Sequence, residues 1–400
     1  MQNSYDIDFE VPFRHRIRFT ENLVEEETNV LLDLLQSPGE LKPRVLVVVD
    51  DQLLEHSGRI AELIVKLQNC ENILLVDGGS SRQSSPAFAM PGGEVVKNSA
   101  EHVEQLLSLI NERNLDRRSF IVAIGGGAVL DAAGYAAAIA HRGIRLIRIP
   151  TTTLAQGDSG VGVKNAINFF KKKNWIGTFA VPWAVINDAA LLTTLPTRDF
   201  RCGFSEAIKV ALLKSPDDFS ELCDQAQQIA NREMNVAFDA IKKSCLWHLK
   251  HITRGGDPFE ALEARPLDFG HWSAHKMEQM SGYRLRHGEA VGIGVAIDCI
   301  YSSRVLGFPE RDVQRVIKCL QDFHLPLWDS TLNDFEVLKA GLEEFRQHLG
   351  GKLTVTMLNE VGDSVNVHEI DMNEMRTSIE TLRELAKNKQ TIHDSESRAT

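Results

Sequence analysis

Four runs of apolar, mostly β-branched residues alternate with segments of helical spacing in the first half of the chain. The runs are residues 44–50, 72–77, 119–124 and 145–149, and the first of them reads RVLVVVD. Continuous apolar runs of this kind are typical of strands buried on both faces of a parallel sheet. The alternation therefore predicts an α/β, Rossmann-like domain over residues 1–195, with weaker edge strands within residues 1–20.

The second half of the chain changes to a period close to 3.6 residues, which predicts a mostly α-helical second domain over residues 196–386. Residues 353–358, LTVTML, are the exception and predict a strand. From residue 387 the chain is polar and poor in apolar residues, so we predict a disordered tail over residues 387–400.

The net charge is −11 over 400 residues, which disfavours a nucleic-acid-binding role. The six cysteines show no CxxC spacing, the N-terminus has no apolar signal-peptide core, and no apolar run approaches the ~20 residues of a membrane span. We therefore expect a cytoplasmic protein with reduced thiols, whose partner is a small molecule rather than a nucleic acid or a membrane.

Three histidines lie close together in the second half. His271 and His275 are four residues apart, so a helix would place them on one face, and His287 opens a short His-Gly-Glu motif. Catalytic zinc sites use three protein ligands and leave one position open, so the cluster predicts a metal site. If only two histidines bind, the third ligand must come from elsewhere in the chain, and a carboxylate is a common choice. Glu206 could supply it, or it could form an ordinary helical ion pair with Lys209.

A glycine-rich turn, Gly125–Gly127, follows the third expected strand and precedes a helix. There the backbone can approach a pyrophosphate, and the helix N-terminus favours its negative charge. Asp50, at the end of the first strand, could accept a hydrogen bond from a ribose hydroxyl. Asp131 could instead cap the helix or face the loop. The turn alone could equally be a simple connection between strand and helix.

The segment 151–174 combines hydroxyl groups, Asp158, Asn174 and the lysines Lys164 and Lys171–Lys173. Lysines beside a glycine-rich loop suit a phosphate group. A solvated basic loop would have the same composition, so both interpretations stay open here.

Taken together, these motifs resemble those of the sugar phosphate cyclase superfamily, whose best-known member is 3-dehydroquinate synthase. The resemblance covers about residues 50–362. Its motifs are GGG-x3-D (Gly125–Asp131), PTT (Pro150–Thr152), AQxDS (Ala155–Ser159), KN-x2-GT (Lys173–Thr178), TLPxR (Thr194–Arg198), E-x2-K (Glu206–Lys209), and GHxxxH and HGE in the histidine cluster. The resemblance implies a Rossmann-like NAD-binding domain followed by a helical metal-binding domain, with NAD and a divalent metal (Zn or Co) as cofactors in a homodimer.

The resemblance also implies a role for individual residues. The metal ligands would be Glu206, His271 and His287. NAD would contact Asp50, Glu94, Lys97, Gly126, Gly127, Asp131, Thr151, Thr152, Lys173, Thr194 and Leu195. Catalytic or substrate-contacting residues would be Asp158, Lys209, Lys250, Glu260, Asp268 and His275, and further substrate contacts would come from Arg142, Lys164 and Asn174. In this family Arg142 is expected to reach the site of a dimer partner.

The activity that the resemblance implies is that of a phosphate-eliminating carbon–oxygen lyase. A carbinol of the bound sugar phosphate is oxidised with NAD⁺, phosphate leaves by elimination, and the hydride returns to the substrate. Ring opening and an intramolecular aldol reaction then close a carbocycle, without net redox change.

The sequence departs from dehydroquinate synthases just before the GHxxxH motif. Those enzymes read R-x-L-L-N there, whereas this chain reads Ala264-Arg265-Pro266-Leu267-Asp268. An arginine out of register and a new acid disfavour a substrate carboxylate. This stretch, and residues 345–351 (FRQHLGG), resemble instead the 2-epi-5-epi-valiolone synthase branch, which cyclises sedoheptulose 7-phosphate.

Other functions remain compatible with the sequence. A divergent 3-dehydroquinate synthase is one. An NAD-dependent polyol dehydrogenase is another, although those enzymes typically use an Asp with histidines where this chain offers Glu206. A non-catalytic NAD-binding protein is a third, but the complete set of candidate metal ligands argues against it.

Overall fold

The computed structural model describes residues 4–36, 41–79, 85–170, 172–255, 259, 266–348 and 352–396. The chain divides into two compact units. The first comprises residues 1–150 and 163–188, and the second comprises residues 151–162 and 189–400. Two short segments of the N-terminal domain predicted from the sequence, residues 151–162 and 189–195, thus belong to the second unit.

A seven-stranded parallel sheet forms the first unit. Its order is β1-β9-β6-β5-β2-β3, with β4 also paired to β2. The strands are β1 (Ile17–Thr20), β2 (Arg44–Asp50), β3 (Leu74–Leu75), β4 (Phe88–Met90), β5 (Phe120–Gly125), β6 (Arg145–Pro150) and β9 (Ala184–Asp188). Strands β2 and β5 are central, and their interior residues are fully buried, as continuous apolar runs predict.

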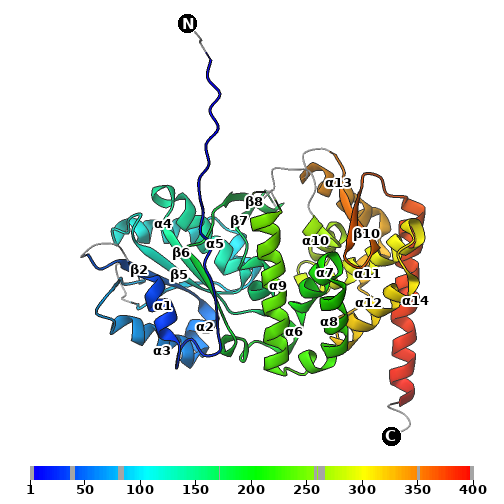
Figure 1. Ribbon diagram of the computed structural model, residues 1–400, viewed down its shortest axis with the longest axis horizontal. Helices are drawn as coiled ribbons and strands as arrows, with labels where there is room; N and C mark the ends of the chain where they lie inside the picture. Colours follow the sequence, from blue (N-terminus) through cyan, green and yellow to red (C-terminus); the bar gives the residue numbers. More distant parts are fainter. Residues whose placement is uncertain are drawn as a thin grey trace. The chain divides into compact units, whose positions relative to one another are not determined.

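Helices cover both faces of this sheet. They are α1 (Thr28–Leu34), α2 (Asp51–His56), α3 (Gly58–Gln68), η1 (Glu94–Lys97), α4 (Glu101–Glu112), α5 (Gly127–Ile139) and η2 (Ala140–Arg142). Figure 1 shows α1 and α3 on one side of the sheet and α4 and α5 on the other. This doubly wound arrangement confirms the α/β fold class expected from the alternation of strands and helices.

Two segments of the first unit differ from the expectations. Among the described residues 4–20, only Ile17–Thr20 forms a strand, and just before it the carbonyl oxygen of Arg16 accepts a hydrogen bond from the backbone N–H of Val185 at 2.8 Å. The basic segment considered as a loop forms an antiparallel hairpin from residue 164 onwards, with strands β7 (Lys164–Phe169) and β8 (Lys172–Phe179). Its inner strand β7 packs against α5 and buries Ala166 and Ile167. These apolar contacts were not evident from the basic composition of the segment.

The second unit is mostly helical, as predicted. Its helices are η3 (Ala155–Ser159), η4 (Ala190–Leu192), α6 (Thr197–Cys202), α7 (Phe204–Lys214), α8 (Pro216–Ala230), α9 (Met234–Arg254), η5 (Pro266–Asp268), α10 (His271–Met280), α11 (His287–Leu306), α12 (Glu310–Asp322), η6 (Ser330–Asn333), α13 (Phe335–His348) and α14 (Met372–Glu396). The expected strand is β10 (Val355–Glu360), which pairs with β11 (Asp363–Val367).

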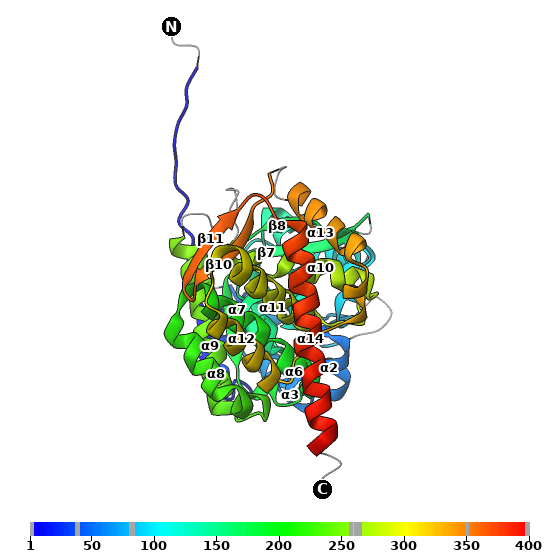
Figure 2. The same ribbon diagram turned by 90° about the vertical axis from the view of Figure 1, so that its right-hand side faces the viewer.

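Helix α11 is the core of this unit. It is buried without interruption from Gly288 to Ser302 and contacts α7, α10, α12, α14 and β10, which surround it in Figure 2. Helix α14 continues beyond residue 387, the point from which a disordered tail is predicted. Among the described residues, no helix is long and apolar enough to cross a membrane.

Candidate functional site

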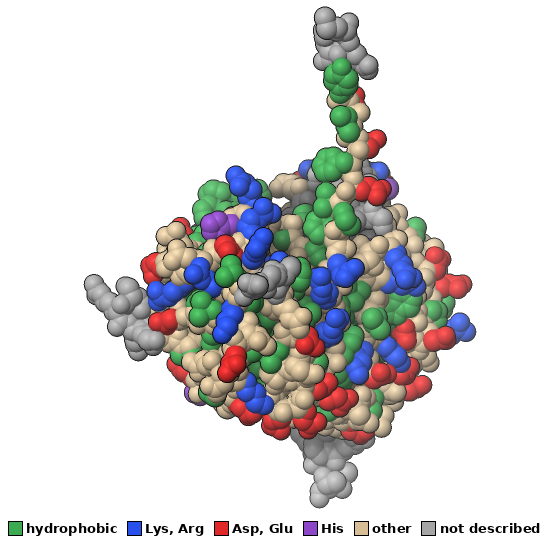
Figure 3. Space-filling model, turned by 60° about the vertical axis from the view of Figure 1, so that its left-hand side comes forward, with side chains coloured by type: hydrophobic (Ala, Val, Ile, Leu, Met, Phe, Trp, Pro, Cys, Tyr) green, Lys and Arg blue, Asp and Glu red, His purple; other side chains and the backbone are tan. Residues whose placement is uncertain are grey.

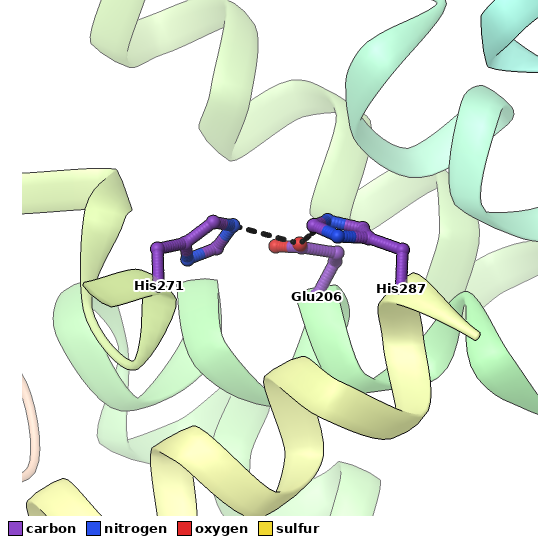
Figure 4. Close-up of side chains that lie close together, drawn as sticks. All are labelled: Glu206, His271 and His287. Carbon is purple, nitrogen blue, oxygen red and sulfur yellow. Dashed lines mark ion pairs between the residues drawn. The ribbon is translucent and has the colours of Figure 1, made fainter. Parts of the chain in front are cut away.

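Glu206 on α7, His271 at the start of α10 and His287 at the start of α11 point toward one another in the second unit (Figure 4). Oε1 of Glu206 lies 3.3 Å from Nε2 of each histidine. Two ligand atoms bound at ~2.05 Å to one tetrahedral zinc ion lie about 3.4 Å apart. The spacing therefore fits three ligands that share one metal ion.

The burial and ionisation of the Glu206 carboxylate also support a shared metal ion. The side chain is 2% exposed, and neither of its oxygens accepts a hydrogen bond from a well-aligned donor, although Nζ of Lys209 lies 2.5 Å from Oε2. Burial alone would raise the pKa of Glu206, but the charges of Lys209 and His271 outweigh it and hold this pKa well below its ordinary value. A buried, ionised carboxylate beside two imidazoles suits a divalent cation.

Two glycines let the histidine-bearing helices approach their neighbours. Gly270 precedes His271 at φ +77°, and a Cβ there would lie 2.7 Å from the backbone nitrogen of Val295 on α11. Gly288 follows His287, and a Cβ there would lie 2.0 Å from the carbonyl oxygen of Cys202. The glycines of the GHxxxH and HGE motifs therefore let α10 approach α11 and let α11 approach α6.

Each histidine is also held at its other ring nitrogen. Nδ1 of His271 lies 3.1 Å from the carbonyl oxygen of Phe269, and Nδ1 of His287 lies 3.1 Å from Oε2 of Glu278. Because a carbonyl oxygen accepts only, the first contact requires a proton on Nδ1, so Nε2 is the nitrogen of His271 that a metal ion would bind. Glu278 is 3% exposed and plays the same part for His287. Glu278 was not predicted from the sequence, although its position seven residues after His271 places both residues on one helical face.

Glu278→Gln is expected to weaken divalent-metal affinity by ~10–100-fold while the fold persists, since outer partners of metal-bound histidines typically contribute that much. Titration of the metal-free protein with Co²⁺, followed by visible absorption, would measure the change. Glu289→Gln is the matched control, because Glu289 is similarly buried at the start of α11 but pairs with Arg198 instead of a histidine. Unchanged Co²⁺ affinity in Glu278→Gln would contradict the assignment.

Asp158, Lys209 and His275 gather around the three proposed ligands. The ring of His275 stacks on that of His287, with centroids 5.9 Å apart. Lys209 is 3% exposed; burial would lower its pKa, but Glu206 and Asp158 raise it, so the ammonium form is retained. Asp268 is half-buried and its charge also acts on Lys209.

Asp158 lies on a π-helical turn, Ala155–Ser159, that α9 holds at two consecutive residues. Ser244 Oγ donates to the Gly157 carbonyl at 3.3 Å, and Nδ1 of His248 lies 2.7 Å from Asp158 Oδ1. Burial would raise the pKa of Asp158, but His248 outweighs it and lowers it. Sequence reasoning missed Ser244 and His248, because no local motif links them to a segment almost ninety residues earlier.

A second buried acid, Asp298 on α11, fixes the backbone around His271. It is fully buried and accepts hydrogen bonds from Gly270 N at 2.9 Å and Trp272 Nε1 at 3.0 Å. Burial raises the pKa of Asp298 to about 7.

This pKa gives a pH-dependent prediction. In the unfolded chain the pKa is ~3.9, so between about pH 4 and pH 7 the folded state binds more protons and its stability falls as pH rises. Relative to the wild type, we expect the free energy of unfolding of Asp298→Asn to increase by about 2–3 kcal/mol between pH 5 and pH 8. Urea unfolding at both pH values measures this, and a difference that does not change with pH would refute it.

In the first unit, the carboxyl ends of β2 and β5 form the expected nucleotide-binding edge. The chain leaves β2 toward β3 on one side and returns to β5 on the other, which makes this the switch point of the sheet. Asp50 ends β2, and Gly126 precedes α5 without a side-chain cap, so the first amides of that helix are available to an anion. A Cβ at Gly92 would meet the Asp50 carboxylate at 2.6 Å, so a side chain at this position would displace that carboxylate. These features fit a dinucleotide.

A polar network next to this edge joins several of the predicted residues. Lys97, 3% exposed, contacts Asp131 Oδ2 at 2.6 Å and Asn174 Oδ1 at 2.5 Å. Asn168 donates to Glu94 at 2.9 Å and accepts from the backbone N–H of Asn174, which has φ +54°. Asn168 was not predicted from the sequence, and it holds Asn174 in that conformation.

The remaining predicted site residues take no part in the contacts described above for the metal site and the nucleotide-binding edge. Lys250 is exposed and lies over the Trp247 ring at 4.2 Å, and Arg142 and Lys164 are exposed in the first unit. Lys173 belongs to the first unit, whereas Thr151, Thr152, Thr194 and Leu195 belong to the second. Glu260 lies outside the described residues.

A Rossmann-like unit joined to a helical unit with an acid and two histidines defines the class of NAD- and metal-dependent enzymes. Sequence profiles narrow this class. The profile of the 3-dehydroquinate synthase N-terminal domain matches residues 87–202, and the profile of the 3-dehydroquinate synthase C-terminal domain matches residues 203–344. The 3-dehydroquinate synthase of Methylacidiphilum infernorum is 36% identical over 299 residues, which are 74% of this chain and 80% of that protein. The chain therefore belongs to the 3-dehydroquinate synthase family, within the sugar phosphate cyclases.

Solved structures share the fold. A 2-epi-5-epi-valiolone synthase from Streptomyces hygroscopicus subsp. jinggangensis, with NAD⁺ and Zn²⁺ bound, has a TM-score of 0.84 at 23% identity and covers 95% of this chain and 99% of its own. A 2-deoxy-scyllo-inosose synthase with carbaglucose-6-phosphate, NAD⁺ and Co²⁺ has a TM-score of 0.73 at 23% identity, over 91% and 95%. These findings confirm the predicted fold class, family and lyase class, and the cofactors of these neighbours are those expected from the sequence.

Proposed function

We propose that this sugar phosphate cyclase acts on a heptulose phosphate without a carboxylate, sedoheptulose 7-phosphate, and forms a cyclitol of the 2-epi-5-epi-valiolone type. The enzyme would work as a homodimer with NAD and a divalent metal. The 2-epi-5-epi-valiolone synthase that shares this fold over most of both chains supports the proposal.

The observation that carries the proposal is Asp268. Its carboxylate lies on η5, next to the proposed ligand His271 in sequence, and its charge acts on Lys209. A substrate carboxylate ~5 Å from Asp268 would be disfavoured by about 3 kcal/mol at an effective dielectric of ~20, or on the order of a hundredfold in affinity. A neutral hydroxyl group could instead donate a hydrogen bond to Asp268.

The chain's own residues would divide the work as follows. Glu206, His271 and His287 would hold the metal, and the edge formed by Asp50, Gly126 and Gly127 would hold NAD. When bound, NAD would exchange a hydride with the substrate and the metal would polarise the oxygen at the oxidised carbon.

The remaining residues bind and orient the substrate. Lys209, kept cationic by its neighbours, would donate to a substrate oxygen, and Asp158, kept ionised beside His248, would accept from a substrate hydroxyl. For the phosphate group we propose His275, Lys164 and Asn174.

A 3-dehydroquinate synthase is the second candidate, because the relative from Methylacidiphilum infernorum carries that name at 36% identity. It would act on a heptulosonate phosphate. Asp268 argues against this substrate, whereas the family-wide similarity argues for it.

The test is phosphate release by the purified enzyme with NAD⁺ and Zn²⁺ or Co²⁺. Sedoheptulose 7-phosphate and the heptulosonate phosphate are compared side by side while NADH absorbance is followed. Release from the heptulose alone, with constant NADH absorbance, is the expected result. Release from the heptulosonate would overturn the proposal in favour of the second candidate, and net NADH formation would indicate a dehydrogenase. Asp268→Asn is the matched variant and should improve use of the heptulosonate.

A further inference from the structure

The N-terminal arm, which we define as residues 4–16, alternates apolar and acidic side chains. Its apolar positions are Tyr5, Ile7, Phe9, Val11 and Phe13, which are 58–83% exposed, and the positions between them include Asp6, Asp8 and Glu10. Figure 3 shows hydrophobic and acidic side chains along this projecting segment. Within the part of the chain that the structure describes, no hydrogen bond or ion pair joins residues 4–12 to the rest.

The alternation is typical of a β-strand, although the arm forms no strand in this structure. Apolar residues at every second position indicate a strand with one buried face. Five such side chains in water are unfavourable, at about 1.5–3 kcal/mol for each large side chain that could be buried. The arm continues directly into β1, which does pair, so the chain enters the sheet only where the arm ends.

The β7–β8 hairpin of the same unit offers a surface of the opposite kind. Among the described strands, β8 pairs only with β7, so its outer edge is not paired with another described strand. Phe169, Phe170, Trp175 and Phe179 on this hairpin are 39–73% exposed. The ring of Phe170 contacts those of Phe169 and Trp175, at 4.5 and 6.4 Å between centroids. An exposed edge strand with apolar side chains is a template for another strand.

The charges of the two surfaces are complementary. The arm carries Asp6, Asp8 and Glu10, and the hairpin strands carry Lys164, Lys172 and Lys173. Pro12 is also compatible with the arm as an edge strand, because proline lacks a backbone N–H and Pro12 alternates with the apolar residues at odd positions. Alternate residues present their backbone groups at opposite edges of a strand, so pairing through residues 7, 9 and 11 leaves the missing N–H of Pro12 on the outer side.

We propose that the N-terminal arm of one chain adds as a strand to the β8 edge of a second copy, and that the exchange is reciprocal. A single chain leaves both surfaces exposed, whereas a two-fold dimer covers both pairs at once. The three aromatic residues of each arm alone could bury ~150 Å² apiece, so the two arms together reach the order of 1,000 Å², the lower range of specific interfaces. This inference assigns the surface of the proposed homodimer and does not depend on the substrate.

The test is the assembly state of the full-length protein, measured by sedimentation velocity over a range of concentrations. Phe9→Asp in the arm and Trp175→Asp in the hairpin are each expected to weaken dimerisation at least tenfold. The double variant should lose little more than either single one, because both changes remove the same contact. Val65→Asp is the control, since Val65 is 50% exposed on α3 of the same unit and should leave the dimer unchanged.

A crosslinking experiment distinguishes exchange between chains from folding of the arm onto its own hairpin. Chains with p-benzoylphenylalanine at position 9 are mixed in ¹⁴N- and ¹⁵N-labelled forms and irradiated. Crosslinks of mixed isotopic mass to the peptide containing residues 172–179 are expected. Crosslinks within one chain only, a monomeric wild type, or a dimer that persists in both variants would each overturn the proposal. None of these measurements requires turnover, so failure here is separate from failure of the proposed activity.

Discussion

His271→Ala should abolish metal retention and turnover together. The imidazole Nε2 lies 3.3 Å from Glu206 Oε1, and its removal leaves two protein ligands where catalytic zinc sites use three. The loss of metal affinity should exceed the ~10–100-fold expected for an outer partner such as Glu278. Elemental analysis of the purified variant, together with phosphate release, measures both effects.

His56→Ala is the control for this experiment. The side chain of His56 is 72% exposed on α2 of the first unit, so its removal should leave the metal content unchanged. A normal metal content in His271→Ala would refute the proposed ligand set and would favour the neighbouring cluster of His275, Glu278 and His287.

Lys209→Met should strongly destabilise the metal-free protein. Lys209 and Glu206 form an ion pair at 2.5 Å with both side chains less than 5% exposed, and Asp158 adds a second negative charge nearby. Breaking a buried pair by removing one partner typically costs about 3–5 kcal/mol, because the other charge remains buried. Urea unfolding of the metal-free variant measures this loss.

Saturation with Zn²⁺ should restore part of the stability of Lys209→Met, since the metal supplies positive charge beside Glu206. Lys243→Met is the matched control. Its 2.6 Å pair with Glu221 lies on side chains that are 35% and 39% exposed, so its loss should cost less than about 1 kcal/mol. Equal losses in the two variants would show that the buried pair contributes no more than a surface one.

The fold was largely predictable because its signals are local. A β-branched apolar run such as residues 44–50 favours a strand buried on both faces, and the structure places β2 at those residues. The hairpin β7–β8 was not predictable in this way. Its burial depends on packing against α5, and the lysines around its turn are those of an ordinary solvated loop.

The candidate metal site was likewise predictable in part. The residues that could bind a metal were predictable, because the glycines beside His271 and His287 and the E-x2-K spacing are local motifs. The contacts that support these residues form only when separate elements of the chain pack together. Glu278, His248 and Asn168 act through contacts across turns, helices or strands. Such contacts depend on how separate elements pack, and a single sequence carries no local signal for that packing.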